Sequence, residues 1–232
     1  MSIPNGAAGE SFESASGILL CCFGPLAMNP TRIPIFPLDV VLFPGAVLPL
    51  HIFEPRYKLM IRRCLNMKLQ FGVVLANTQG IAATGCTASI TSLVKRYPDG
   101  KMDILTRGEL PFQVKQIFDE QPYYEAAIEC LDEAPEPYPA PSPELRDAYE
   151  QCHWLLFNRG PNKLQGSARL SPAYAMAHSL PLPPEDKQAL LEMRDESARQ
   201  AHLLAQLREW LPRLLDLNER RGRARGNGHS LN

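Results

Sequence analysis

The first half of the sequence carries the hydrophobic pattern of β-structure. From Ile33 to about Leu131, apolar runs are short and are punctuated by glycine, proline and Asp-Gly. The run Leu69 to Ala76 (LQFGVVLA) is almost continuously apolar, as is typical of a strand buried on both faces. Several short strands, joined by tight turns and without long helices between them, predict a barrel or a strongly bent sheet.

Turn residues indicate where the strands connect. Thr87 to Tyr97 leads through Pro98-Asp99-Gly100 into Lys101 to Leu105. Asp-Gly between two extended runs predicts a hairpin, because glycine accepts the positive φ that the turn requires. Pro44-Gly45 likewise indicates a turn or bulge. Pro49 cannot donate a ladder hydrogen bond, so its strand is expected at a sheet edge or a bulge.

Two other segments of this half have periods of their own. Residues 124–131 alternate only in part between apolar and polar positions, which fits a strand near a sheet edge. Pro55 to Asn66 (PRYKLMIRRCLN) has apolar residues at helical spacing and predicts one amphipathic helix among the strands. Proline fits the first turn of such a helix. Arg56 is expected to pair with Glu54 or with a main-chain carbonyl.

After a proline-rich connector the apolar period becomes helical. Ala134 to Pro143 holds five prolines in ten residues, which excludes a helix or a central strand and predicts a stiff extended linker. Ser142-Pro143 and Ser171-Pro172 each supply an N-cap and a first-turn proline for a helix. A third, long helix is expected to begin at Pro184 and to kink or end at Pro212.

The chain is therefore expected to divide at the connector. We expect a barrel subdomain over residues 31–133, a linker over 134–143, a helical subdomain over 144–218 and a disordered basic tail over 219–232. Residues 1–30 precede the first patterned segment. They are expected to be a disordered leader or an artefact of the start site, since translation could begin at Met1 or at Met28.

Composition and charge exclude several classes of protein. The 232 residues carry a formal net charge of −1, so the chain has no overall positive charge that would attract nucleic acid or an anionic membrane. The apolar stretch Ile18 to Ala27 is too short to span a bilayer and has no basic residue before it, so a secretory signal is not expected. The six cysteines form no C-x-x-C pair and are expected to be thiols in a reducing cytosol. These features predict a cytoplasmic protein without a membrane segment.

No constellation in the sequence predicts catalysis, a cofactor or a metal site. A phosphate-binding loop needs G-x-x-x-x-G-K-[S/T], and the one Gly-Lys, Gly100-Lys101, is followed by Met102. A G-x-S-x-G nucleophile elbow is missing as well. Cys152 and His153 are adjacent, so on a helix their side chains would point about 100° apart, which suits neither a dyad nor a chelate. His51 is expected to be a strand histidine satisfied by a neighbouring carbonyl.

Residues 33–57 read IPIFPLDVVLFPGAVLPLHIFEPRY. This stretch resembles the opening of the Lon N-terminal domain family, especially its stand-alone bacterial members. The similarity extends through Phe71-Gly72-Val73-Val74 and Tyr123-Tyr124-Glu125-Ala126 into the last predicted helix, over about residues 31–217. It implies an α+β fold, with a PUA-like β-barrel followed by a C-terminal helical bundle. Pro111 stands where the family often has arginine, which affects any contact of that arginine but not the fold.

The resemblance also implies a function. A complete Lon protease needs an ATPase domain and a Ser-Lys protease domain, and this sequence encodes neither. It is therefore expected to be a recognition module rather than an enzyme, one that binds unfolded or exposed hydrophobic polypeptide segments and could cooperate with a separate protease. Most of the motif is expected to be architectural. The candidate peptide-binding residues within it are Phe43, Pro44, Leu48, His51, Phe53, Arg56 and Tyr57.

RNA binding is the alternative function, because PUA-like barrels elsewhere bind RNA. Such binding requires a basic face, aromatic platforms, or both. The near-neutral charge argues against it. The feature that favours it is the basic tail, with Arg220, Arg221, Arg223 and Arg225.

Overall fold

The computed structural model describes residues 31–78, 80–131, 137–161 and 171–226. The expected leader over residues 1–30, with the alternative start at Met28, lies outside the described residues. So do the last six positions of the expected tail.

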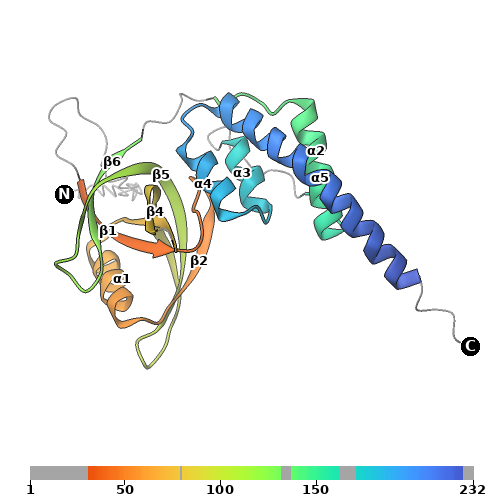
Figure 1. The fold of residues 1–232 in the computed structure, drawn as a ribbon. Coiled ribbons are helices and arrows are strands. Elements are labelled where there is room, and N and C mark those ends of the chain that lie inside the picture. Colours follow the sequence, from red (N-terminus) through yellow and green to blue (C-terminus); the bar gives the residue numbers. More distant parts are fainter. Residues whose placement is uncertain (1–30, 79, 132–136, 162–170, 227–232) are drawn as a thin grey trace, which may run out of the picture.

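Six strands form one sheet in this part of the chain. They are β1 (Thr31–Leu38), β2 (Val47–Ile52), β3 (Phe71–Asn77), β4 (Gly80–Arg96), β5 (Met102–Phe118) and β6 (Glu125–Cys130). The strand order is β2-β5-β4-β3-β1-β6, and β5 also pairs with β6, so five of the strands close into a barrel while β2 is added at an edge (Figure 1). β1 and β3 are parallel, and the other pairs are antiparallel. The predicted barrel is confirmed.

The long strand β5 makes the closure possible. One edge of β5 pairs with β4, and its other edge pairs with two strands in succession. Its first part pairs with β2, from Met102 to Arg107, and its second part pairs with β6, from Phe112 to Phe118. The sequence pattern placed the β6 segment near a sheet edge, and that prediction is wrong. β6 pairs with β1 on one side and with β5 on the other. Its alternation is weak because it is buried along most of its length.

Glycines in β3 and β4 make room for a large ring inside the barrel. Phe112 of β5 is fully buried in a cluster with Ile35 and Val74. A Cβ on Gly72 would lie 2.6 Å from the Phe112 ring, and a Cβ on Gly85 would lie 2.7 Å from it. These separations are well inside van der Waals contact, so the ring fits because neither position carries a side chain.

Helix α1 (Pro55–Met67) follows β2 and confirms the predicted amphipathic helix. Pro55 occupies its first turn, and Lys68 ends it in the left-handed conformation. Its buried face consists of Tyr57, Met60, Ile61 and Cys64. On its polar side, Arg63 donates to the Tyr123 hydroxyl at 2.9 Å and to Glu125 at 2.6 Å. This contact fixes the helix to the start of β6.

Four helices form the second half of the described structure (Figure 1). They are α2 (Pro143–Phe157), α3 (Pro172–Ser179), α4 (Pro184–Glu192) and α5 (Glu196–Gly226). The predicted starts of the first two are confirmed, since the Ser142 hydroxyl accepts from the Leu145 amide and the Ser171 hydroxyl accepts from the Tyr174 amide. Both caps satisfy amides that lack a partner in the first helical turn.

The third predicted helix is two helices. The chain leaves helical conformation at Met193–Asp195, where the Asp195 carboxylate accepts from the Ala198 amide at 2.7 Å and caps α5. α5 contains Pro212 and continues past it to Gly226. Of the two outcomes expected at Pro212, a kink or an end, the end does not occur; up to residue 226 the structure also differs from the expected disordered tail. Arg213 pairs with Glu209, and Arg220 pairs with Asp216, each four residues apart; such pairs stabilise the helix in this stretch.

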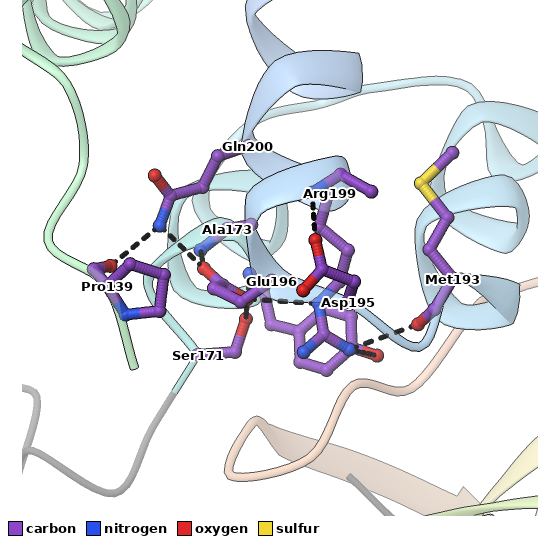
Figure 2. Close-up of polar contacts among 10 residues, drawn as sticks. Pro139, Ser171, Ala173, Met193, Asp195, Glu196, Arg199 and Gln200 are labelled. Atoms are coloured by element: carbon purple, nitrogen blue, oxygen red, sulfur yellow. Dashed lines mark hydrogen bonds and ion pairs between the residues drawn. The ribbon is translucent and has the colours of Figure 1, made fainter. Parts of the chain in front are cut away.

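A buried polar cluster holds α3, α5 and the linker together (Figure 2). Glu196, at the start of α5, accepts from the Ser171 hydroxyl at 2.5 Å and from Arg199 Nε at 3.0 Å. Arg199 also donates to the Tyr174 hydroxyl at 2.6 Å. Gln200 donates to both Glu196 and the carbonyl of Pro139 in the linker. Glu196 and Arg199 are each 1% exposed, so the cluster belongs to the interior.

The helices pack directly on the barrel. Phe43, which precedes β2, stacks on Tyr174 of α3 with 4.8 Å between ring centroids. Gln188 of α4 donates to the carbonyl of Thr84 in β4 at 3.0 Å. One hydrophobic cluster runs through this junction from the barrel into the helices.

Candidate functional site

A tight turn and a bulge set the position of β2. The Ala46 amide donates to the Phe43 carbonyl, and Gly45 has φ +77°, as the third residue of a type II turn requires. Gly45 then donates to the Gly108 carbonyl, while the Gly108 amide donates to the Ala46 carbonyl. Two residues of one strand thus face one residue of the other, which is a glycine-type β-bulge. The predicted turn or bulge at Pro44-Gly45 is confirmed.

The bulge determines which N–H and C=O groups of β2 point toward β5 and which point away from it. The Ala46 carbonyl points toward β5, and inward and outward main-chain groups alternate along a strand. Leu48 follows the same direction, since its carbonyl accepts from Thr106 Oγ1 of β5 at 2.8 Å. Val47, Pro49 and His51 therefore direct their main-chain groups away from β5. β2 pairs with β5 alone among the described strands, so these groups line an open sheet edge.

Pro49 lies where the sequence pattern expected it, in an edge strand. Its missing N–H falls on the open side, so the ladder with β5 loses nothing. The open edge consequently offers the amides of Val47 and His51 but none between them. This spacing limits indiscriminate pairing, as proline commonly does at sheet edges.

Apolar side chains border this edge. Val47 is 44% exposed, and Phe53, just after β2, is 57% exposed. Leu48 and Leu50 point the other way and pack against the core. The strand thus follows the period of two, with one face in the core and one face in solvent. We call the exposed set of Val47, Pro49, His51 and Phe53 the β2 face.

A polar and aromatic network orients His51 on the β2 face. His51 Nδ1 lies 2.6 Å from Oδ1 of Asp103, and the Tyr97 hydroxyl donates to Oδ2 of the same carboxylate at 2.7 Å. The bond to His51, followed by that to Tyr97, lowers the pKa of Asp103. The bond to Asp103 in turn raises the pKa of Tyr97. Lys95 Nζ lies 4.5 Å from the Tyr97 ring centroid. The partner of His51 is thus a carboxylate rather than the expected carbonyl.

The structure separates the seven candidate peptide-binding residues into two groups. Phe43 is fully buried, and Tyr57 is buried with its ring centroid 4.2 Å from that of Phe36. Both belong to the core and offer no surface to a partner. The remaining candidates are accessible, with Pro44 and Leu48 half-buried and His51, Phe53 and Arg56 exposed. Arg56 pairs with Glu54 at 2.8 Å, which is one of the two partners expected for it.

Sequence reasoning missed Tyr97, Asp103 and Lys95. The sequence did contain a signal for the pairing of Lys95 with Asp103. The Asp-Gly turn fixes the register of β4 and β5 and places these two residues opposite each other. No local signal places His51 beside Asp103. That contact depends on the pairing of β2 with β5, because His51 and Asp103 lie 52 positions apart in the sequence.

Metal and membrane features are not found within the described ranges. No cluster of three or more histidine, cysteine or acidic residues there could hold a metal ion. None of the described helices combines the length and apolar character needed to cross a bilayer.

Solved structures share this fold. A Lon N-terminal domain protein from Xanthomonas campestris superposes with a TM-score of 0.60 and is 26% identical in sequence, over 75% of this chain and 98% of that one. The N-terminal domain of the Mycobacterium avium complex Lon protease superposes with a TM-score of 0.53 at 18% identity, over 76% of this chain and 98% of that one. The second similarity concerns the fold alone.

Sequence comparison extends over most of the chain. The Escherichia coli K12 Lon protease is 30% identical over 207 residues, which are 78% of this chain and 26% of that protein. The Lon protease of Buchnera aphidicola is 29% identical over 203 residues, or 77% of this chain and 25% of that protein. The chain thus spans about a quarter of the length of these relatives. The family described as the ATP-dependent protease La (LON) substrate-binding domain matches residues 32–209, and the chain belongs to that family.

Proposed function

We propose that the chain is a non-catalytic module that recognises exposed apolar polypeptide segments at the open edge of β2. The observation that carries this proposal is the unpaired edge, whose outward groups belong to Val47, Pro49 and His51. Membership of a substrate-binding family supports a polypeptide as the ligand. In this role the chain would act in the cytoplasm, in protein quality control, together with a separate protease.

The edge suits an extended segment for a physical reason. An added strand gains main-chain hydrogen bonds at every second residue, and its alternate side chains meet the flanking surface. Here the amides of Val47 and His51 are the available donors, and the exposed side chains of Val47 and Phe53 provide apolar contact. Main-chain hydrogen bonds do not depend on the identity of the side chains, so this site would accept many apolar segments.

An aromatic substitution tests the apolar part of the site. Phe53→Ser should weaken the binding of a fluorescent denatured protein about tenfold, since exposed aromatic side chains commonly dominate such contacts. Trp154→Ser is the matched control, because Trp154 of α2 is also 57% exposed but lies outside the barrel. Binding can be followed by fluorescence anisotropy. Equal losses in the two variants would contradict the proposal, as would the absence of binding by the unaltered protein at tens of micromolar.

A second pair of variants tests the main-chain part. Val47→Pro removes one outward main-chain amide, whereas Val47→Thr keeps that amide and has a side chain of similar shape. One lost hydrogen bond is worth about 1 kcal/mol, so the proline variant should bind peptides about fivefold more weakly than the threonine variant. Circular dichroism and thermal unfolding check that both variants fold. Equal affinities would mean that the edge does not pair with the ligand.

RNA binding has less support. Arg213 and Arg220 of α5 are each paired with an acidic residue one turn earlier, which reduces the basic character of that helix. Titration with structured RNA at low and high salt distinguishes the two functions, because phosphate contacts weaken steeply as salt rises.

A further inference from the structure

A cavity lies at the junction between the barrel and α4, and its lining includes no residue of the β2 face. Its volume is about 370 Å³, near the lower end for ligand pockets. The end of β3 and the start of β4 form one wall, with the apolar side chains of Leu75, Ile81 and Ala82. This volume suits one long side chain rather than a large ligand.

Helix α4 forms the opposite wall with a single stripe of residues. Glu185, Gln188, Ala189 and Glu192 line the cavity, and they are three or four positions apart, so they share one helix face. Glu185 and Glu192 are both exposed. In the part of the chain that the structure describes, neither carboxylate forms an ion pair with a lysine or arginine. Among the described residues, the stripe therefore presents two negative charges without a positive partner.

Gln188 adds a buried polar group to the same wall. The residue is 8% exposed, and its amide nitrogen donates to the Thr84 carbonyl and to Glu192 Oε1, at 3.0 and 2.8 Å. Its Oε1 is buried and accepts no hydrogen bond from the described residues. Buried amide oxygens normally accept at least one bond, so this residue of the cavity wall keeps an acceptor that the described residues do not use.

We propose that this cavity binds the side chain of a lysine or arginine in a bound polypeptide. The aliphatic stem of such a side chain matches the apolar wall of Leu75, Ile81 and Ala82, while its cationic head matches Glu185 and Glu192. An acidic or purely apolar side chain would leave the two carboxylates without a counter-charge. The ligand being a polypeptide rests on the proposed function; the preference for a cationic head rests on the cavity alone.

Small probes test the cavity independently of the β2 face. N-acetyl-lysine methylamide and N-acetyl-arginine methylamide should shift the amide resonances of Ala82 and Ala189 in ¹H–¹⁵N spectra, whereas N-acetyl-norleucine methylamide should not. The Glu185→Gln/Glu192→Gln double variant should bind the cationic probes about 3- to 30-fold more weakly, as expected for two exposed ion pairs. Asp147→Asn/Glu150→Gln, which removes two exposed acids of α2, is the matched control and should bind them unchanged.

Peptides then connect the cavity to the proposed function. A peptide with one lysine in an apolar context should bind more tightly than its norleucine counterpart, and the difference should disappear in the Glu185→Gln/Glu192→Gln variant. Equal binding of the two peptides, or probe shifts located elsewhere, would overturn the cavity proposal and leave the β2 site intact. Cationic probes that bind while no peptide does would instead overturn the proposed function.

Discussion

Glu196 of α5 caps the first turn of α3, because its Oε1 accepts from the Ala173 amide at 3.0 Å. The same carboxylate accepts from Ser171 and Arg199 (Figure 2). One buried acid therefore satisfies a helix end, balances a buried cation and connects two helices that are separated in sequence.

Replacing Glu196 with alanine should destabilise the protein strongly. Removing one partner of a buried ion pair costs about 3 kcal/mol or more, because Arg199 loses its carboxylate in the interior while the α3 amide loses its acceptor. Glu209→Ala is the control, since Glu209 forms an exposed pair with Arg213 and should change stability by less than about 1 kcal/mol. Urea unfolding measures both. Similar losses in the two variants would show that the cluster contributes little.

Gly108→Ala should disturb the β2 edge from the opposite strand. A Cβ on Gly108 would lie 2.2 Å from the Phe43 carbonyl oxygen, which is main-chain and cannot rotate away. Overpacking of this kind costs about 1–3 kcal/mol. Gly160→Ala meets nothing within 4 Å and should be close to neutral. Thermal unfolding compares the two, and an unaffected Gly108→Ala variant would contradict the close approach of the Phe43 turn.

Local signals in the sequence predicted those elements that depend on neighbouring residues. The Ser142 and Ser171 caps, the hairpin at Gly100 and the turn at Gly45 each depend on one or two residues, and the structure confirms them. The break between α4 and α5 was not predictable in this way. The apolar stripe continues across it, and the break involves Arg199, which donates back to the carbonyl of Met193.

At the candidate site, too, local sequence signals did not predict contacts between distant residues. The motif around Phe43 and Tyr57 was visible, but hydrophobic character alone does not distinguish a core ring from a surface ring. Phe53 is exposed and Phe43 is buried, although both lie in the same apolar stretch. The difference arises from the packing of Phe43 against Tyr174 of α3, a contact across more than a hundred residues.

The carboxyl group of Asp103 should titrate below its ordinary pKa of 3.8, because His51 and Tyr97 both hydrogen-bond its charged form. A lowered folded-state pKa means that the interaction stabilises the fold above about pH 4 and is lost as the pH falls below 3.8. His51→Gln and Tyr97→Phe should each move the pKa upward. Side-chain carboxyl NMR measures it, with Asp99 as the internal control, because the pKa of Asp99 is lowered by Lys101 instead. If Asp99 moved together with Asp103, the assigned cause would be wrong.

The thiols of Cys64 and Cys152 should resist alkylation while the protein is folded. Burial raises the pKa of each thiol to about 11 from an ordinary value of 9.0. At pH 8 only about 0.1% of each would be thiolate, which is the reactive form. Because the folded-state pKa is raised, the burial of each neutral thiol contributes stability below pH 9.0 that is lost as the pH rises toward 11. Iodoacetamide labelling followed by peptide mass spectrometry should show slow modification at both sites at pH 8 and fast modification in urea. Rapid labelling of either cysteine in the folded protein would mean that its helix, α1 or α2, opens locally.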